Sequence, residues 1–384
     1  KAWHDIVVNA IRASPRSAAP GVSGMRASWL HQMANDKDSG SLIPIIAQWV
    51  EGLLRGGDAD LLRTVRLVLI PKPDNRGLRP LGVGECVANV AKRIAHGVLL
   101  TAAEPALAAG GQWISTKGGT HGVASVLSHA HARGASLLAV DVRNAFNCVD
   151  RSAVAAAADR VSPACAPFVR WSLQPASLVH RSRIVSTVGR GVVQGDPLSS
   201  TLFALVIVDV LAAMVAACQA RNVHVVLLRP DTDPLASVDN MGDDDVAVCA
   251  YADDMTLVWR NADSASVAMT ELQAALDHVG LELARPKCVL VGGAGVAHDE
   301  VSAAAEKLAV VTKPAAVFVG VPIGNTSDAR ALLIAQVKEK AKLLQGAWFL
   351  RRPMAEHAFL RHCGLATRLT YVLQACGDGV VNDS

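Results

Sequence analysis

The chain has 384 residues, more than one simple core usually holds, so we expect two or three subdomains. Its net charge of +3, from 37 basic and 34 acidic residues, is too small to establish a nucleic-acid partner by itself. The eight cysteines include no CxxC pair, which argues against a zinc site or a disulfide framework and favours a reducing, intracellular compartment. Because the first residue is Lys rather than Met, we expect a fragment of a larger protein.

The first hundred residues predict helices and one hairpin. Residues 3–14 and 42–55 have apolar side chains at helical spacing, with a Pro- and Gly-rich turn between them. Residues 64–84 alternate apolar and polar side chains around a Pro-Asp-Asn-Arg-Gly turn, which predicts a β-hairpin. Residues 85–104 follow as a helix with one apolar face.

The middle of the chain predicts a buried strand, a helix and a second hairpin. Residues 136–149 begin as a buried strand that ends at Asp141. Residues 151–175 predict a helix, and residues 182–196 predict a hairpin.

An apolar helix comes next. Pro197 precedes the helix predicted over residues 198–219, because a proline is tolerated where a helix starts. Its longest apolar run, residues 202–218, is interrupted by Asp209 and is shorter than the about 20 residues that a membrane span needs. We therefore expect a buried helix and no membrane partner.

Two acidic clusters lie close together in "MGDDDVAVCAYADDMTLVW". Asp253 and Asp254 join two β-prone apolar runs, so we expect them at the turn of a hairpin. The other cluster, Asp243 to Asp245, closes the stretch 229–245, whose composition predicts a solvated loop.

The remaining residues complete an α+β pattern. We expect a helix over residues 263–279, a strand over residues 288–293, a strand region over residues 315–324, and a helical tail from Ala329. Helices that alternate with short antiparallel strands indicate an α+β fold class.

Asp141 is a candidate partner for the hairpin carboxylates. A strand ending in Asp and a hairpin carrying Asp253 and Asp254 can lie side by side, and three such carboxylates could chelate two divalent ions. Two Mg²⁺ ions about 3.5–4 Å apart activate a hydroxyl and stabilise a leaving pyrophosphate in nucleotidyl transfer. The alternative is that Asp141 caps the following turn.

Several stretches resemble, in order, the successive motifs of reverse transcriptases: "DVRNAFNCVD", "GVVQGDPLSSTLFAL", "YADDMTLV", "GLELARPKCVLV" and "VFVGVPIG". "KPDNRGLRPLGVG" resembles the fingers motif, and "APGVSGMRASWL" the leading motif of non-LTR (LINE-type) retrotransposon enzymes. "FLRHCGLATRLTYVL" is similar to the start of their thumb, so the resemblance covers nearly the whole chain.

The resemblance implies a right-hand polymerase. Residues 1–135 would be the fingers with some palm elements, residues 136–324 the palm with an antiparallel sheet, and residues 325–384 a helical thumb.

The resemblance also assigns catalytic roles. Asp141 and Asp253 match the metal-binding aspartates, Asp254 matches the second hairpin aspartate, and the backbone carbonyl of Val142 would be a further metal ligand. Lys287 matches the lysine that protonates the departing pyrophosphate, although a solvent-facing lysine is the alternative.

Nucleotide-binding roles follow in the same way, and Val142, named above as a metal ligand, is also expected to bind the nucleotide. Lys72 and Arg79 match residues that hold the incoming triphosphate. Gln194 and Gly195 would let the backbone approach the nucleotide and template. Phe146 lies where the family places an aromatic ring beneath the sugar, which would select deoxynucleotides; it could equally be a core phenylalanine.

The expected function is therefore RNA-templated DNA synthesis in retrotransposition, by extension of a primer 3′-hydroxyl with dNTPs. The expected partners are an RNA template and a DNA primer, and the expected cofactors are two Mg²⁺ ions, with Mn²⁺ as a substitute. In a eukaryotic retrotransposon the protein would be nuclear. An RNA-dependent RNA polymerase is one alternative, disfavoured by Ala252 and Phe146. A degenerate RNA-binding scaffold is another, disfavoured because all three aspartates are present. The acidic loop 231–245 has no counterpart in the family pattern, and the oligomeric state stays open.

Overall fold

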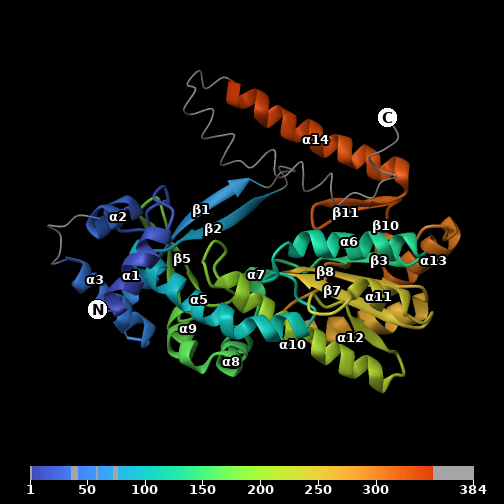
Figure 1. Cartoon of the computed structure of the whole chain (residues 1–384), viewed down its shortest axis with the longest axis horizontal. Helices are drawn as coiled ribbons and strands as arrows, with labels where there is room; N and C mark the ends of the chain where they lie inside the picture. Colours follow the sequence, from blue (N-terminus) through green and yellow to red (C-terminus); the bar gives the residue numbers. More distant parts are fainter. Residues whose placement is uncertain (1, 36–41, 58, 72–76, 349–384) are drawn as a thin grey trace. The chain divides into compact units, whose positions relative to one another are not determined.

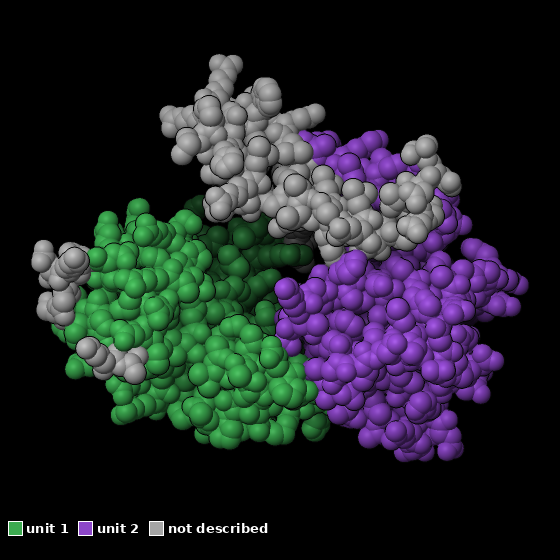
Figure 2. Space-filling view, in the orientation of Figure 1, with its two compact units in different colours: residues 1–107, 143–210, 276–282 green, residues 108–142, 211–275, 283–384 purple. Residues whose placement is uncertain are grey.

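The computed structural model describes residues 2–35, 42–57, 59–71 and 77–348 (Figure 1). The chain divides into two compact units, coloured separately in Figure 2. Unit 1 contains residues 1–107, 143–210 and 276–282, and unit 2 contains residues 108–142, 211–275 and 283–384. Each unit is assembled from segments that are far apart in the sequence. The expected fingers, palm and thumb boundaries stay predictions, and the tail motif within residues 349–384 lies outside the described residues.

Three helices pack together at the start of unit 1: α1 (Ala2–Ala13), α2 (Ala27–Asn35) and α3 (Leu42–Leu54). Each helix buries apolar side chains, including Ile11, Leu30 and Val50. The helices expected over residues 3–14 and 42–55 are confirmed, and α2 is an addition.

Unit 1 has a four-stranded sheet in the order β2-β1-β4-β5. Its strands are β1 (Val65–Pro71), β2 (Leu78–Val83), β4 (Ala176–His180) and β5 (Arg183–Val188). β1 and β2 are antiparallel, so the hairpin expected over residues 64–84 is confirmed. The hairpin expected within residues 182–196 is wrong, because β5 pairs with the preceding strand β4. Their two-residue turn, Arg181-Ser182, has positive φ at both positions but lacks the usual Asn or Gly, so its sequence carries no turn signal.

The helix expected over residues 151–175 is broken. α8 (Arg151–Val161) ends at Ser162, and Pro163 opens a short 3₁₀ turn before α9 (Ala166–Ser172). A proline cannot continue a helix, because it lacks the N–H that the preceding turn needs. The other helices that begin in unit 1 are α4 (Asp60–Arg63), α5 (Cys86–Ala109), α7 (Ala145–Cys148) and α10 (Ser199–Ala220).

α10 is, among the described residues, the one helix long and apolar enough to cross a membrane by length and composition. Of its most apolar window, 61% is buried inside the protein, as expected for a core helix.

Unit 2 is built on a six-stranded sheet in the order β10-β9-β3-β8-β7-β6 (Figure 1). The strands are β3 (Ser136–Val140), β6 (Val225–Leu227), β7 (Val246–Tyr251), β8 (Asp254–Trp259), β9 (Val289–Val291) and β10 (Val311–Thr312). The four central strands are antiparallel, but β10–β9 and β6–β7 are parallel, which corrects the expectation of an antiparallel sheet. Helices α13 (His298–Leu308) and α11 (Pro234–Asp239) lie in the connections of these parallel pairs, and parallel strands need such crossovers.

Helix α6 (Gly119–Ala132) packs on β3 and β7 and closes the core of unit 2. Leu127, Leu137 and Val258 are fully buried in this core. The hairpin β11 (Ala315–Phe318) and β12 (Val321–Gly324) contacts α6, and α14 (Thr326–Trp348) packs against it. The remaining helices are α12 (Ala262–His278) and the 3₁₀ turn η2 (Arg285–Lys287).

The stretch 229–245 is more ordered than a solvated loop. It contains α11, whose N-terminus is capped by the Asp233 carboxylate, which accepts hydrogen bonds from the N–H groups of Leu235 and Ala236. Asp is a favoured N-cap residue, and Pro234 occupies the first helical position. The prediction of a solvated loop is therefore only partly right, because the Asp and Pro residues of the stretch also start a capped helix.

A buried ion pair joins α5 to the loop before α10 in unit 1. The side chains of Lys92 and Asp196 are 9% and 10% exposed, and the ammonium donates a hydrogen bond to the carboxylate. The other carboxylate oxygen of Asp196 accepts the N–H of Leu198. Asp196 belongs to the QGDPLS stretch, so this pair fixes where that motif lies.

We predict that Lys92→Met lowers the free energy of unfolding by about 3–5 kcal/mol, because it leaves a buried carboxylate without its counter-ion. Urea denaturation followed by circular dichroism measures the loss. Lys313→Met, at an exposed lysine, is the control and should change stability by less than about 0.5 kcal/mol. Equal stability of the two variants would contradict the role given to the pair.

Candidate active site

Asp253 and Asp254 lie at the hairpin of β7 and β8. Tyr251 pairs with Asp254, which leaves Ala252 and Asp253 as a two-residue loop. The hairpin predicted from "YADDMTLV" is therefore confirmed, with Asp254 as the first residue of β8.

Asp141 follows directly after β3, which pairs antiparallel with β8. The last pair of that register is Val140 opposite Met255, so the next pair outward is Asp141 and Asp254. The structure thus brings together two carboxylates that are far apart in the sequence, at the same end of one sheet.

The proximity of these carboxylates changes their electrostatics. Burial, and then the charges of Asp253 and Asp141, raise the pKa of Asp254 to about 6. Asp254 is an exposed residue, so the protein removes its carboxylate only partly from solvent. In the absence of a cation, negative charge in this cluster is unfavourable.

Asp141 has one oxygen that no hydrogen bond satisfies. Its Oδ2 atom is buried without a hydrogen-bond partner and lies 3.6 Å from the Nζ atom of Lys287. Two hydrogen bonds hold the Asp141 backbone. Its N–H donates to the Sγ of the buried Cys288 at 3.4 Å, and its carbonyl accepts the N–H of Ala284 at 2.8 Å. Lys287, whose side chain is 67% exposed, therefore lies next to Asp141, and its role as a proton donor stays a prediction.

The donor set fits Mg²⁺ by its chemistry. Carboxylate oxygens are the ligands that Mg²⁺ prefers, and an unsatisfied Asp141 oxygen beside Asp254 is a place where a cation would be stabilised. Val142 is buried and forms an isolated bridge with Leu283, which fixes the backbone next to Asp141. Within the described ranges, however, no three His, Cys, Asp or Glu side chains are grouped closely enough to form a ready-made metal site.

Of the predicted nucleotide-binding residues, Val142 belongs to unit 2 and the others belong to unit 1. Arg79 is exposed on β2, and Lys72 lies outside the described residues. Near the other end of β2, the N–H of Gly82 donates to the carbonyl of Gln194 at 2.9 Å. Gly195 has a φ of +97°, a backbone conformation that residues with a side chain rarely adopt, so this position favours glycine.

Phe146 lies against the same loop. Its ring stacks on that of Phe203 in α10, with centroids 4.8 Å apart, and its carbonyl accepts the N–H of Val192 at 2.7 Å. A Cβ on Gly191 would collide with the backbone of Phe146 and Asn147. The structure therefore brings β2, the Gln194 loop and Phe146 together within unit 1, and the half-buried Phe146 has a fixed ring orientation.

The second acidic cluster has local partners in unit 2. The Asp244 carboxylate accepts a hydrogen bond from Asn261 at 2.6 Å, and that of Asp245 accepts the N–H of Gly242 at 2.8 Å. These bonds shape the loop before β7.

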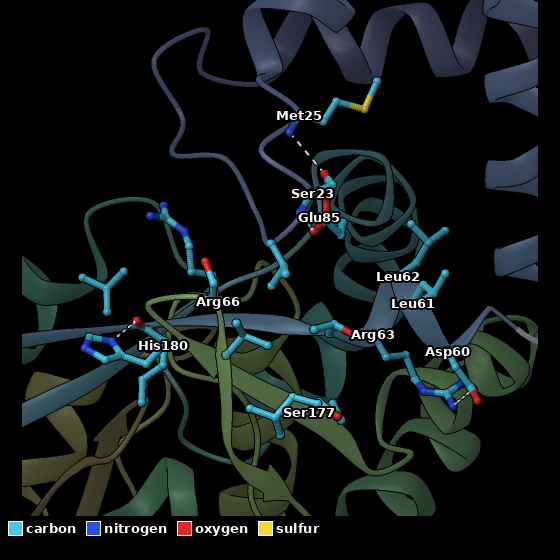
Figure 3. A pocket seen from close by; sticks show the side chains of 18 of the residues that line it. Ser23, Met25, Asp60, Leu61, Leu62, Arg63, Arg66, Glu85, Ser177 and His180 are labelled. Carbon is cyan, nitrogen blue, oxygen red and sulfur yellow. Dashed lines mark hydrogen bonds and ion pairs between the residues drawn. The ribbon is translucent and has the colours of Figure 1, made fainter.

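A large hollow in unit 1 does not coincide with the predicted site residues. It measures about 1440 Å³, and Figure 3 shows Ser23 and Met25 near Glu85, with Arg63 beside Asp60. Ser23 donates its N–H and its hydroxyl to the Glu85 carboxylate, at 2.8 and 2.6 Å, which attaches the "APGVSG" segment to the start of α5. A hollow of about 250 Å³ lies beside Asp254. A catalytic site is defined by its reactive side chains and not by the size of a hollow, so we place the candidate site at the carboxylates of Asp141, Asp253 and Asp254.

Three structural residues were missed by the sequence analysis. Cys288 and Gln112 contact the backbone beside Asp141 and Asp253, and Asp196 pairs with Lys92. Asp196 stood within a quoted motif and could have been singled out. The other two carry no local signal, because their partners are distant in the sequence.

We predict that Asp254→Asn stabilises the metal-free protein at pH 8 but not at pH 4. The folded-state pKa of about 6 lies above the ordinary value of 3.8, so the folded protein loses stability as Asp254 ionises across this window, and Asn removes that charge. The expected gain in melting temperature at pH 8 is about 1–2 °C, measured by thermal denaturation in EDTA.

Asp244→Asn is the control for that measurement. Asp244 lies in an exposed loop, so we expect no gain that depends on pH in this way. The same increase for Asp254→Asn at both pH values would contradict the charge argument.

The comparison with known families identifies one match. The family model described as reverse transcriptase (RNA-dependent DNA polymerase) matches residues 70–323, about two thirds of the chain, and includes Asp141 and Asp253. No curated protein matches the chain significantly. The chain therefore belongs to the reverse transcriptase family and is an RNA-directed DNA polymerase, a nucleotidyltransferase.

Proposed function

We propose that the chain extends a primer 3′-hydroxyl with dNTPs on an RNA template by a two-metal mechanism, as part of a non-LTR retrotransposon. The observation that carries this proposal is the pairing of β3 with β8, which sets Asp141 beside Asp254 and next to the loop that holds Asp253. Two metal ions in nucleotidyl transfer would be held by carboxylates that meet at one point, and the neighbouring positions of Asp141 and Asp254 support this proposal.

Each residue at the carboxylate cluster has a role in this proposal. Asp141, Asp253 and the Val142 carbonyl would hold two Mg²⁺ ions, or Mn²⁺ as a substitute, with Asp254 beside them. When bound, these ions supply activation of the primer hydroxyl and stabilisation of the leaving pyrophosphate. Lys287 would donate a proton from Nζ to that pyrophosphate, and its ion pair with Asp141 keeps the ammonium near the site.

The residues of unit 1 would bind the nucleotide. The Arg79 guanidinium offers a planar pair of donors for triphosphate oxygens, and it is exposed on β2. The Gln194-Gly195 backbone is held against β2 by the Gly82 hydrogen bond, so its position relative to Arg79 is defined. Phe146, fixed by Phe203, would lie under the sugar and exclude a 2′-hydroxyl.

The non-LTR assignment rests on the leading motif. Ser23 and Glu85 hold the "APGVSG" segment against α5, so that segment is part of the folded unit. We propose an RNA template and a DNA primer as partners, and a nuclear location if the source is eukaryotic.

We predict that Asp253→Ala abolishes extension of oligo(dT) on poly(rA) with Mg²⁺, because a carboxylate that holds the metals cannot be replaced by a methyl group. Asp244→Ala is the matched control, since it removes an aspartate from the exposed loop of the same unit, and we expect near-parental activity. Equal damage from both changes would refute the assignment.

We predict that Phe146→Val lowers the preference for dATP over ATP by at least about tenfold, roughly 1.4 kcal/mol in the barrier difference. The smaller side chain relieves the clash with the 2′-hydroxyl and remains apolar against Phe203, so the fold should persist. Single-nucleotide incorporation kinetics measure both substrates. A variant that rejects ATP as strongly as the parent would make Phe146 a core residue only. A parent that already prefers ATP would instead support an RNA-building polymerase.

A further inference from the structure

Ala252, the residue before Asp253, has an unusual backbone conformation. Its φ is +56°, in the left-handed region, where the Cβ of an L-residue crowds the backbone. Asp253 is not among the residues with positive φ, so positive φ falls only on the first loop position of this hairpin, where glycine is usual. Such a conformation persists only where the surroundings hold it.

The side chain of Gln112 supplies that support. Its Nε2 donates to the carbonyl of Ala252 at 2.9 Å, and its Oε1 accepts the N–H of Ala252 at 3.1 Å. Gln112 is fully buried, and a buried amide is costly unless its polar atoms are paired. The Gln112 side-chain amide therefore forms hydrogen bonds with both the N–H and the carbonyl of Ala252, the residue of this turn with positive φ.

Gln112 is itself held in place by its neighbours on the chain. Ala250 donates its N–H to the carbonyl of Gly111 at 3.0 Å, and Trp113 donates its N–H to the carbonyl of Ala250 at 2.9 Å. The ring N–H of Trp113 also donates to the carbonyl of Leu228 at 2.8 Å, and this ring is 5% exposed in the core. These bonds fix the segment Gly111–Trp113 along β7, so the Gln112 amide has a defined position.

We propose that Gln112 is a positioning residue for the catalytic hairpin. It holds Ala252 in the left-handed conformation and so keeps Asp253 and Asp254 beside Asp141. The inference rests on the proposed function of these carboxylates. Gln112 itself contacts the backbone of the turn and no reacting group.

The test uses a cycle of variants at positions 112 and 252. Gln112→Ala removes both hydrogen bonds, and we expect kcat for primer extension to fall by about tenfold or more, with KM for dNTP within about twofold. Ala252→Gly introduces a residue that adopts positive φ without help. In that background, Gln112→Ala should lower kcat by less than about threefold, because the turn no longer needs the clamp.

A second readout does not depend on activity. Hydrogen exchange of the Ala252 amide should be slow in the parent and at least about tenfold faster in Gln112→Ala, because the bond to Oε1 is lost. Ser136→Ala is the matched control, since it removes a buried side-chain contact to the Gly293 N–H at the far end of β3. It should leave both kcat and the exchange of Ala252 unchanged.

The outcomes separate this inference from the proposed function. If Gln112→Ala lowers kcat equally in the parent and in the Ala252→Gly background, the positioning role is overturned. An Ala252 amide that stays protected in Gln112→Ala overturns it as well. A parent enzyme that extends no primer overturns the proposed function instead. In that case the exchange measurement still decides whether Gln112 holds the turn.

Discussion

β3 and β8 pair in antiparallel register from Ser136 opposite Trp259 to Val140 opposite Met255. This register determines which residues emerge together where the strands end, and it sets Asp141 beside Asp254. Side chains alternate between the faces of a sheet, so a slip of one residue would send one carboxylate to the opposite face. The buried apolar residues of β3 and β8 oppose that slip, because it would move the side chains of one strand, such as Leu137, out of the packed positions that they fill. The core of unit 2 thus specifies the geometry of the site.

Bringing carboxylates together has an electrostatic cost that the surrounding structure offsets only in part. Burial, and then repulsion from Asp253 and Asp141, raises the pKa of Asp254, and Lys287 supplies a cation beside Asp141. A fold that keeps such a cluster must hold it by other interactions, and here backbone hydrogen bonds to Cys288 and Gln112 do so. The backbone is therefore hydrogen-bonded to neighbouring side chains where the carboxylates repel one another.

Much of the site was predictable because its residues stand at the ends of strongly patterned strands. The β7–β8 hairpin followed from two apolar runs around Ala252-Asp253, and Asp141 followed from a buried strand. The parallel edge strands β6 and β10 were not predictable, since strands of two or three residues carry no periodicity. The hydrogen bonds of Gln112 to Ala252 were not predictable for another reason. A side-chain contact between distant segments leaves no local pattern in the sequence of either segment.

The Arg181-Ser182 turn shows the same limit, because its left-handed residues are not the Asn or Gly that mark such turns. Pro163, by contrast, was visible in the sequence, and the predicted helix should have ended before it.

The interleaving of the two units has a consequence for synthesis on the ribosome. β3 can pair only after β8 and β9 are made, more than a hundred residues later. Unit 1 is complete only after residues 276–282 are made. Until then, a nascent chain carries β3 with both edges unpaired, and unpaired apolar strands are prone to associate with other chains. Contacts between such distant segments also make folding slow. A chain that is released before residue 276 is made would therefore have neither unit complete, and its survival would depend on protection by chaperones.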